Sequence, residues 1–264
     1  MSSAPGLARQ VRMPVARWLG GWWRVAQFSA SMLSLAASPA SYRGEQRRIV
    51  AHHLVAGTGS ALLWFTLVAA LATLVITRIV LVTAISYGLS RYALEMLIRV
   101  LVLELIPLAA AFFVAVQFAL PAGTEIVQLR RRGQFAAQQA AGIDPLRREL
   151  LPRALAGVFT VLMLASTAGV VALVLAYLVA HGFSPWGLAG YTRTVGHVMS
   201  PAVALVFALK TLLFSLAVAL MPLASAMADA PARRVRAGPE LRGLIRMLAV
   251  MVLIELGSLM VNYL

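Results

Sequence analysis

The dominant pattern along the chain is a series of five long apolar stretches separated by shorter polar connections. Each stretch reaches the roughly 20 residues that a helix needs to cross the hydrocarbon core of a bilayer. All five are predicted to be helices, because unpaired backbone polar groups are costly in lipid. The predicted spans cover residues 54–82, 94–122, 152–180, 200–224 and 243–264.

Composition agrees with this pattern. The chain is 61% hydrophobic, whereas soluble domains are closer to half apolar. The connections between spans are too short to bury a core of their own. We therefore predict an all-α integral membrane protein, with a basic N-terminal segment over residues 1–49 and a membrane domain over 50–264.

The distribution of basic residues predicts the orientation. Positive charge concentrates on the cytoplasmic side of membrane proteins. The connections near 83–93 and 181–199 hold one arginine each. Eighteen of the 23 basic residues fall instead in the N-terminal segment and in the connections 123–153 and 226–246. With five spans, this places the N-terminus in the cytoplasm and the C-terminus in the periplasm.

The N-terminal segment has the composition of a helix that lies in the headgroup layer. Trp18, Trp22 and Trp23 stand between Arg17 and Arg24, and tryptophan with arginine is typical of interfacial helices. A disordered basic tail is the alternative. A cleaved signal peptide is not expected, since no uninterrupted apolar core precedes a cleavage site.

The sequence offers no enzyme chemistry. It has no cysteine, no glycine-rich phosphate loop, no Ser-His-Asp set and no paired carboxylates in a soluble cleft. His181 and His197 lack the spacing of metal ligands, so neither a metal nor a cofactor is expected. Nucleic-acid binding is not expected either, because the arginines alternate with apolar spans instead of forming a basic face. Any ATP hydrolysis would belong to a separate chain.

Three charged residues are predicted near the middle of the membrane, namely Glu104, Lys210 and Glu255. A lone charge there costs on the order of 2.5–3.5 kcal/mol, so Lys210 should pair with Glu255 or with Glu104. A structural ion pair of Lys210 with Glu255 is the simpler interpretation. Glu104 is also a candidate for substrate contact, because Pro107 on the same helix frees backbone carbonyls.

Several short motifs resemble those of one family. Glu104 to Pro107 resembles a Glu-Leu-Gly-Pro motif, Glu125-Ile126 an Ala-Glu-Ile/Leu-Gly motif and Lys210 to Phe214 a Lys-Ser-x-x-Phe motif. Ala141 to Pro145 matches Gly-Ile-Asp-Pro, and Pro152 to Gly157 matches Pro-Arg-x-x-Ala-Gly. Over residues 45–264 the chain thus resembles the MlaE/YrbE-type permeases, the membrane subunits of MCE-associated ABC lipid transporters.

The chain also departs from that family's pattern. Val116 to Leu120 stands where the family has Gly-Arg-x-Gly-Ser, and Leu103 replaces the arginine before the Glu-Leu-Gly-Pro motif. Gly133-Gln134 replaces Glu-Gln, and Gln139 replaces a later glutamate. We interpret the chain as a divergent member, which leaves both a homodimer and a pairing with a second, non-identical permease open.

The resemblance implies a dimer of five-span subunits and a coupling helix, over about residues 125–142, that docks on a cytoplasmic ABC ATPase. Gly123 and Gly142 bound this segment, as expected for a helix. A plain solvated connector is the alternative, since loops lie on the surface for many reasons. The predicted ATPase-coupling residues are Glu125, Arg130, Arg131, Arg132, Gln134, Gln139 and Asp144.

The resemblance also implies an outward-opening lipid cavity between the two subunits. Its mixture of apolar walls and a few polar groups suits a phospholipid. Arg99 lies about one helical turn from Leu103, and we expect it to replace the family's lost positive charge near the headgroup. The predicted lipid-binding residues are Ile76, Thr83, Ala84, Tyr87, Arg99, Leu103 and Glu104.

The leading functional prediction is an ABC permease subunit in the bacterial inner membrane. It would move phospholipid between that membrane and a periplasmic MCE partner, as in systems that maintain outer-membrane lipid asymmetry. One alternative is an ion- or proton-coupled secondary transporter, although the chain lacks the internal repeats on which many such folds are built. Another is a non-transporting assembly subunit of a lipid transport complex. A partner ATPase distinguishes the first from the second, and lipid dependence of that ATPase distinguishes the first from the third.

Overall fold

The computed structural model describes residues 5–42, 44–228 and 238–263, and every regular element in these ranges is a helix. Five helical segments are long and apolar enough to cross a membrane, as the hydrophobic pattern predicts. They cover Gln46–Ser86, Tyr92–Arg131, Leu146–His181, Pro201–Met227 and Gly243–Asn262. The protein is therefore a multi-pass membrane protein.

The first three spans are longer than predicted, because the helices continue past the apolar stretch into polar sequence. The helix of the first span begins at Glu45. The elements, in chain order, are α1 (Pro5–Ala37), η1 (Pro39–Tyr42), α2 (Glu45–Ser86), α3 (Ser90–Leu97), η2 (Ile98–Leu105), α4 (Ile106–Val114), η3 (Ala115–Ala119), α5 (Leu120–Arg131), α6 (Gln134–Ala140), η4 (Leu146–Leu150), α7 (Leu151–His181), η5 (Pro185–Gly187), α8 (Leu188–Val198), α9 (Pro201–Ala228) and α10 (Gly238–Tyr263).

Prolines shape the second and third spans. The elements η2, η3 and η4 are π-helical turns, and each ends two residues before a proline, at Pro107, Pro121 and Pro152. A proline has no N–H and its ring clashes with the carbonyl four residues earlier. Widening the preceding turn relieves that clash, which is why π-helical turns often interrupt α-helices. The chain therefore crosses each proline without ending the span.

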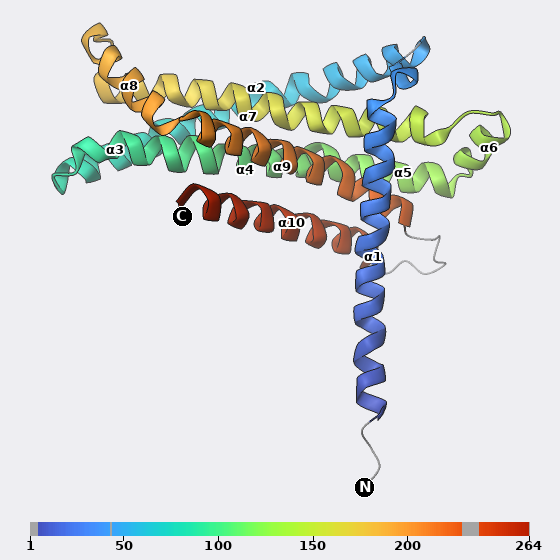
Figure 1. Cartoon of the computed structure of the whole chain (residues 1–264). Coiled ribbons are helices and arrows are strands. Elements are labelled where there is room, and N and C mark those ends of the chain that lie inside the picture. Colours follow the sequence, from blue (N-terminus) through green and yellow to red (C-terminus); the bar gives the residue numbers. More distant parts are fainter. Residues whose placement is uncertain (1–4, 43, 229–237, 264) are drawn as a thin grey trace.

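The spans pack as a bundle in which α7 and α9 lie at the centre. α2 packs along α7, α10 packs along α9, and the second span contacts both central helices. Figure 1 shows these long helices running side by side. Their main buried core includes Val114, Val161, Leu164, Phe214 and Val218.

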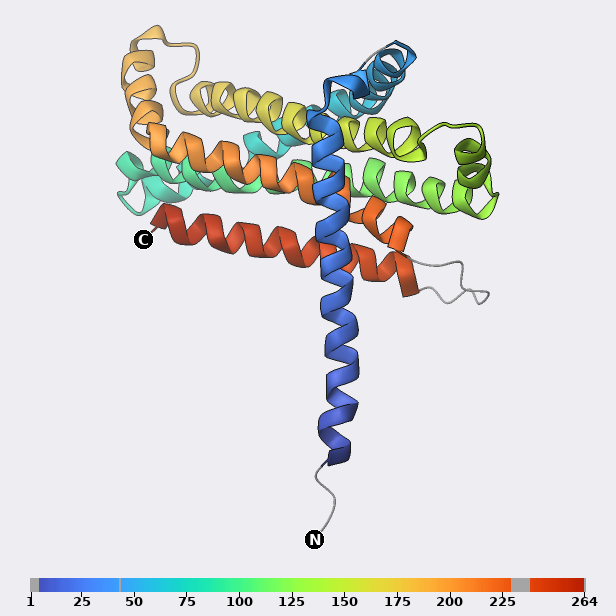
Figure 2. The ribbon, with the colours of Figure 1, turned by 45° about the vertical axis from the view of Figure 1, so that its right-hand side comes forward.

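Helix α1 runs across the long helices and extends beyond the bundle (Figures 1 and 2). It packs on α9 and α7 and buries Val25 and Met32 there. Trp23 on the same helix is exposed. A transverse helix with exposed tryptophan suits the headgroup layer, but its position relative to the bilayer remains a prediction. The side chains of Arg17 and Trp18 lie outside the described residues.

The two ends of the bundle differ in their charge. The start of α2, α6, the end of α9 and the start of α10 lie at one end, and α3, α8 and the C-terminus lie at the other (Figure 1). We call these the α6 end and the α8 end. The α6 end carries the arginines of the connection 123–153, one of the basic connections that predict a cytoplasmic face.

The α8 end is held by an aromatic contact. Tyr191 donates a hydrogen bond to the Leu173 carbonyl at 2.7 Å and packs on Tyr177. Burial raises the pKa of Tyr191 to about 12, because a phenolate would lose its hydration there. The connection between the third and fourth spans is thereby fixed to α7.

Close helix packing at one glycine gives a direct test of the bundle. A Cβ atom at Gly157 on α7 would lie 3.1 Å from the Ala219 Cβ and 3.4 Å from the Ala219 Cα on α9. We expect Gly157→Leu to force the two helices apart and to lower stability by about 1–3 kcal/mol. The melting temperature in detergent measures this. Gly190→Leu is the matched control, since nothing lies within 4 Å of the Gly190 position. Equal melting temperatures for the two variants would contradict the packing.

Candidate functional site

A charged cluster lies inside the bundle where the second, fourth and fifth spans meet. Lys210 on α9 is 2% exposed and its Nζ forms an ion pair with Glu104 on η2. The same Nζ lies 2.8 Å from the Glu255 Oε2 on α10. The structure thus shows one lysine between two glutamates, where the sequence predicted that it would pair with at least one. Asn262 Nδ2 donates to the Glu104 Oε1 at 3.5 Å.

A backbone carbonyl of the second span accepts a further hydrogen bond from this lysine. Pro107 has no N–H to donate to the Leu103 carbonyl, four residues earlier. Lys210 Nζ donates to that carbonyl at 3.4 Å, so it lies among two carboxylates and one backbone oxygen. This mutual pairing offsets much of the cost of three charges in lipid.

The α6 end contains the segment for which a single coupling helix was predicted over residues 125–142. The structure corrects this, because the segment consists of two helices. α5 continues the second span as far as Arg131, and α6 is a separate helix of 7 residues. Gly133 and Gly142, with φ of 70° and 73°, turn the chain before and after α6. Glycine tolerates this left-handed conformation without strain, which explains the break.

A chain of polar contacts joins α6 to the spans. Gln138 Nε2 on α6 donates to the Glu149 Oε1 on η4 at 3.2 Å. Arg153 NH1 on α7 donates to the Glu149 Oε2 at 2.8 Å, and Arg153 NH2 lies 3.4 Å from the Glu125 Oε2 on α5. Arg130 on α5 donates to the Met227 carbonyl at 2.7 Å, which ties the second span to the end of α9. We call Gln138, Glu149, Arg153 and Glu125 the elbow relay.

The predicted coupling residues divide between this relay and the surface. Glu125 belongs to the relay, and Arg130 is half-buried against α9. Asp144 Oδ1 accepts the Leu146 N–H at 3.0 Å and so fixes the turn into η4. The others of the set are exposed around α6, namely Arg131, Arg132, Gln134 and Gln139.

The residues predicted to bind lipid are spread over the α8 half of the bundle. Leu103 and Glu104 are buried, and Lys210 contacts the backbone carbonyl of Leu103 and the carboxylate of Glu104. Ile76 packs against the main core. Thr83, Ala84 and Tyr87 lie near the turn between α2 and α3, where Thr83 and Tyr87 are exposed and Ala84 is half-buried. Arg99 lies on η2, and its NH2 forms an ion pair with the Glu95 Oε1 at 3.1 Å. Whether they bind lipid remains a prediction.

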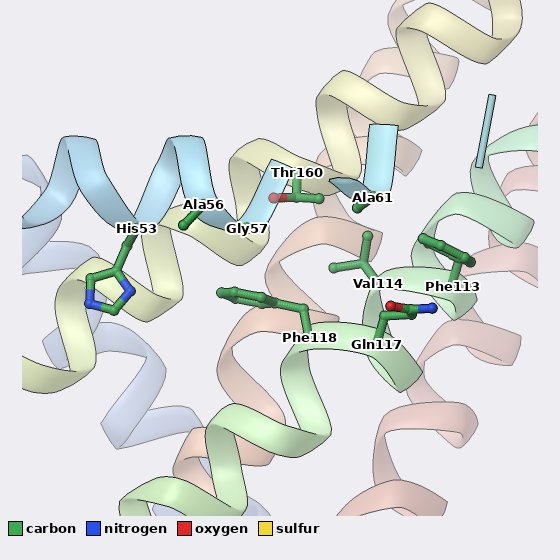
Figure 3. A pocket seen from close by; sticks show the side chains of 9 residues that line it. All are labelled: His53, Ala56, Gly57, Ala61, Phe113, Val114, Gln117, Phe118 and Thr160. Atoms are coloured by element: carbon green, nitrogen blue, oxygen red, sulfur yellow. The ribbon is translucent and has the colours of Figure 1, made fainter. Parts of the chain in front are cut away.

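A pocket of about 240 Å³ lies elsewhere, between α2, α4, η3 and α7. Figure 3 shows the His53 and Phe118 rings at one end of it and Ala61, Phe113 and Gln117 toward the other. We call it the α2–η3 pocket. Sequence reasoning did not identify it, and it also did not identify Gln138, Glu149 and Asn262. The departure of Val116 to Leu120 from the family motif was the one available signal, because Gln117 and Phe118 lie there.

Across the described part of the chain, no group of three or more His, Asp or Glu side chains is arranged to hold a metal ion. What this geometry offers is a buried charged cluster within the spans and a hydrogen-bonded route from an exposed helix into them. Such an arrangement joins the exposed helix to the spans by direct polar contacts.

Comparison with known proteins agrees with these features. No curated protein matches the chain. Residues 50–258, well over half of the sequence, match the family model described as Permease MlaE. The matched range includes Glu104, Lys210 and Glu255 of the charged cluster and all four residues of the elbow relay. Asn262, which contacts Glu104, lies outside it. The chain therefore belongs to the MlaE permease family.

Proposed function

We propose that this protein is the membrane subunit of an ABC transporter that moves phospholipid between the bacterial inner membrane and a periplasmic MCE partner. ATP is hydrolysed on a separate cytoplasmic chain, and the permease works as a dimer with a second copy or a related subunit. The α6 end faces the cytoplasm and the α8 end faces the periplasm. Membership of the family and the five spans support this proposal.

The observation that carries the proposal is the elbow relay. α6 is exposed, so a cytoplasmic protein can reach it, yet Gln138 joins it to Glu149 and hence to Arg153 on α7. Movement of α6 is thus passed to the third span and, through Glu125, to the second. A plain solvated connector needs no such bonds. The exposed arginines on this face also suit a docking surface for a partner.

Affinity purification of the tagged chain in mild detergent, followed by mass spectrometry of proteins and lipids, tests this function. We expect an ABC ATPase, an MCE protein and phospholipid to co-purify. A stable chain that brings down no ATPase and no lipid would overturn the proposal and favour the secondary transporter, in which Glu104 would be titrated next. If an ATPase co-purifies but its rate does not change when phospholipid is added, this protein would instead be an assembly subunit.

Arg99 provides a specific test of lipid binding at the periplasmic end. Its guanidinium bonds Glu95 yet keeps 31% of its side-chain surface exposed, so it has donors left for a lipid phosphate. We expect Arg99→Ala to lower co-purifying phospholipid about fivefold, the effect of losing about 1 kcal/mol of hydrogen bonding. Lipid mass spectrometry measures the change. Arg193→Ala, an exposed arginine at the same end, is the control. Unchanged lipid in Arg99→Ala would remove Arg99 from the site.

A further inference from the structure

The α2–η3 pocket contains an amide group with no partner. Gln117 is exposed on η3, and within the described ranges no hydrogen bond is made by its side chain. A polar group without a partner in hydrocarbon is unfavourable, and amides in membranes are found bonded to a neighbour. The side chain therefore calls for a polar partner that the described part of the chain does not supply.

In a bilayer centred on the spans, the pocket would extend from the headgroup layer into the hydrocarbon. With the bilayer centred on the spans, Gln117 lies about 8 Å from the middle of Tyr92–Arg131 at 1.5 Å per residue. His53 lies about 20 Å from the middle of Gln46–Ser86, beyond the hydrocarbon boundary at about 15 Å. The pocket thus runs from the headgroup layer at the α6 end to apolar surface around Ala61 and Phe113.

Two glycines shape the wall of the pocket. The Phe118 ring lies against Gly57 on α2, where a Cβ would come within 3.0 Å of the Phe118 Cε2. On the other side, a Cβ at Gly157 on α7 would lie 3.8 Å from the Phe118 Cε1. The ring therefore separates α2 from the second span at this level. The pocket beside it is a consequence of a large side chain held between two small ones.

The volume limits the ligand. Pockets for whole drug-sized molecules measure about 300–1,000 Å³, and this one measures about 240 Å³. A complete two-chain lipid does not fit, whereas a glycerol-ester segment with the first part of one acyl chain does. Ester carbonyls accept hydrogen bonds, which the Gln117 amide can donate. His53 lies where the headgroup would emerge.

We propose that the α2–η3 pocket binds a glycerophospholipid of the cytoplasmic leaflet, with an ester carbonyl on Gln117, the headgroup beside His53 and one acyl chain against Ala61 and Phe113. Because Gln117 lies deeper than the ester layer of a bilayer, the bound lipid sits further into the membrane than its neighbours. The pocket is then a second lipid site, separate from the predicted periplasmic set. This inference rests on the proposed orientation and on lipid transport.

Photolabelling tests the site directly. The complex is placed in nanodiscs of phosphatidylethanolamine and phosphatidylglycerol that contain a phosphatidylethanolamine with a diazirine on one acyl chain, and labelled residues are mapped by mass spectrometry. We expect labelling within residues 53–61 and 113–118 that saturates at low probe content. Labelling around Leu253, an exposed position on α10, reports ordinary boundary lipid and should rise linearly with probe.

Three variants make the test specific. Gln117→Leu removes the amide and keeps a similar size, so pocket labelling should fall about 3- to 10-fold. Ala61→Phe fills the pocket and should lower labelling more than about 10-fold by exclusion. Val116→Phe, beside the pocket on an exposed position, is the control and should change nothing. Gln117→Leu alters only an exposed side chain, so it keeps the test valid should Ala61→Phe fail to fold.

The opposing outcomes are distinct. Pocket labelling that follows Leu253 or survives Gln117→Leu would show boundary lipid and overturn the site. The chain has no cysteine, so a Gln117→Cys variant that cross-links to a second copy would show that a partner subunit satisfies this position, which also overturns it. A retained ATPase without pocket labelling refutes the site alone. Saturable labelling without any co-purifying ATPase supports the site and refutes the proposed ABC function.

Discussion

Lys210→Met is expected to lower the stability of the protein by about 3–5 kcal/mol, because it leaves the buried Glu104 and the partly buried Glu255 without their shared cation. Lys210 contacts both Glu104 and Glu255 and is almost completely buried. The two acids come from different spans, so their repulsion would push the second span away from the fifth. Thermal unfolding of the purified protein in nanodiscs, followed by intrinsic fluorescence, measures the loss.

A charge-neutral variant separates electrostatics from packing. Lys210→Met combined with Glu104→Gln and Glu255→Gln removes all three charges while keeping similar shapes. We expect this triple variant to recover most of the lost stability, since replacing a whole buried ion cluster is often close to neutral. A triple variant as unstable as Lys210→Met would contradict the account, because the defect would then come from lost packing around Phe214.

Arg153→Leu is expected to disconnect the proposed partner ATPase from the spans. Arg153 NH1 donates to the Glu149 Oε2 at 2.8 Å and to the Glu149 backbone carbonyl at 2.7 Å. Losing charged hydrogen bonds at a side chain only 12% exposed costs about 2 kcal/mol. We expect the fold to survive while lipid-stimulated ATP hydrolysis falls at least tenfold. A phosphate-release assay on the purified complex measures the rate.

Two control variants define the role of the Arg153 guanidinium. Arg153→Lys keeps the charge but cannot bond two carboxylates in one plane, so it should retain only part of the stimulation. Arg48→Leu removes an exposed arginine at the same end of the bundle and should leave the rate unchanged. Normal lipid stimulation of ATP hydrolysis in Arg153→Leu would show that the ATPase and the spans are coupled through other contacts.

The spans and the charged cluster were predictable because lipid imposes strong constraints. Apolar length identifies a spanning helix, and a mid-membrane lysine must find an acid. What sequence could not decide was which acid pairs with Lys210, since that depends on the rotation of α9 relative to its neighbours. The structure answers with both Glu104 and Glu255. The Leu103 carbonyl was partly foreseeable, because Pro107 cannot bond to it.

The divided elbow and the α2–η3 pocket were harder to predict. The break at Gly133 depends on a left-handed backbone, and an isolated glycine within a helical pattern does not specify that. The elbow relay joins residues from four elements, so spacing along the chain gives no indication of it. The pocket exists because Phe118 fits between Gly57 and Gly157, a contact among three spans that no local pattern encodes.

The central claim is that this permease uses ATP hydrolysed by a partner to move phospholipid. The most direct measurement places the purified complex in liposomes with a fluorescent phospholipid and follows its transfer to or from the soluble MCE partner. We predict transfer that requires ATP hydrolysis and is lost in Arg153→Leu but retained in Arg48→Leu. Transfer at the same rate with a non-hydrolysable ATP analogue, or transfer driven by a pH gradient alone, would contradict the account.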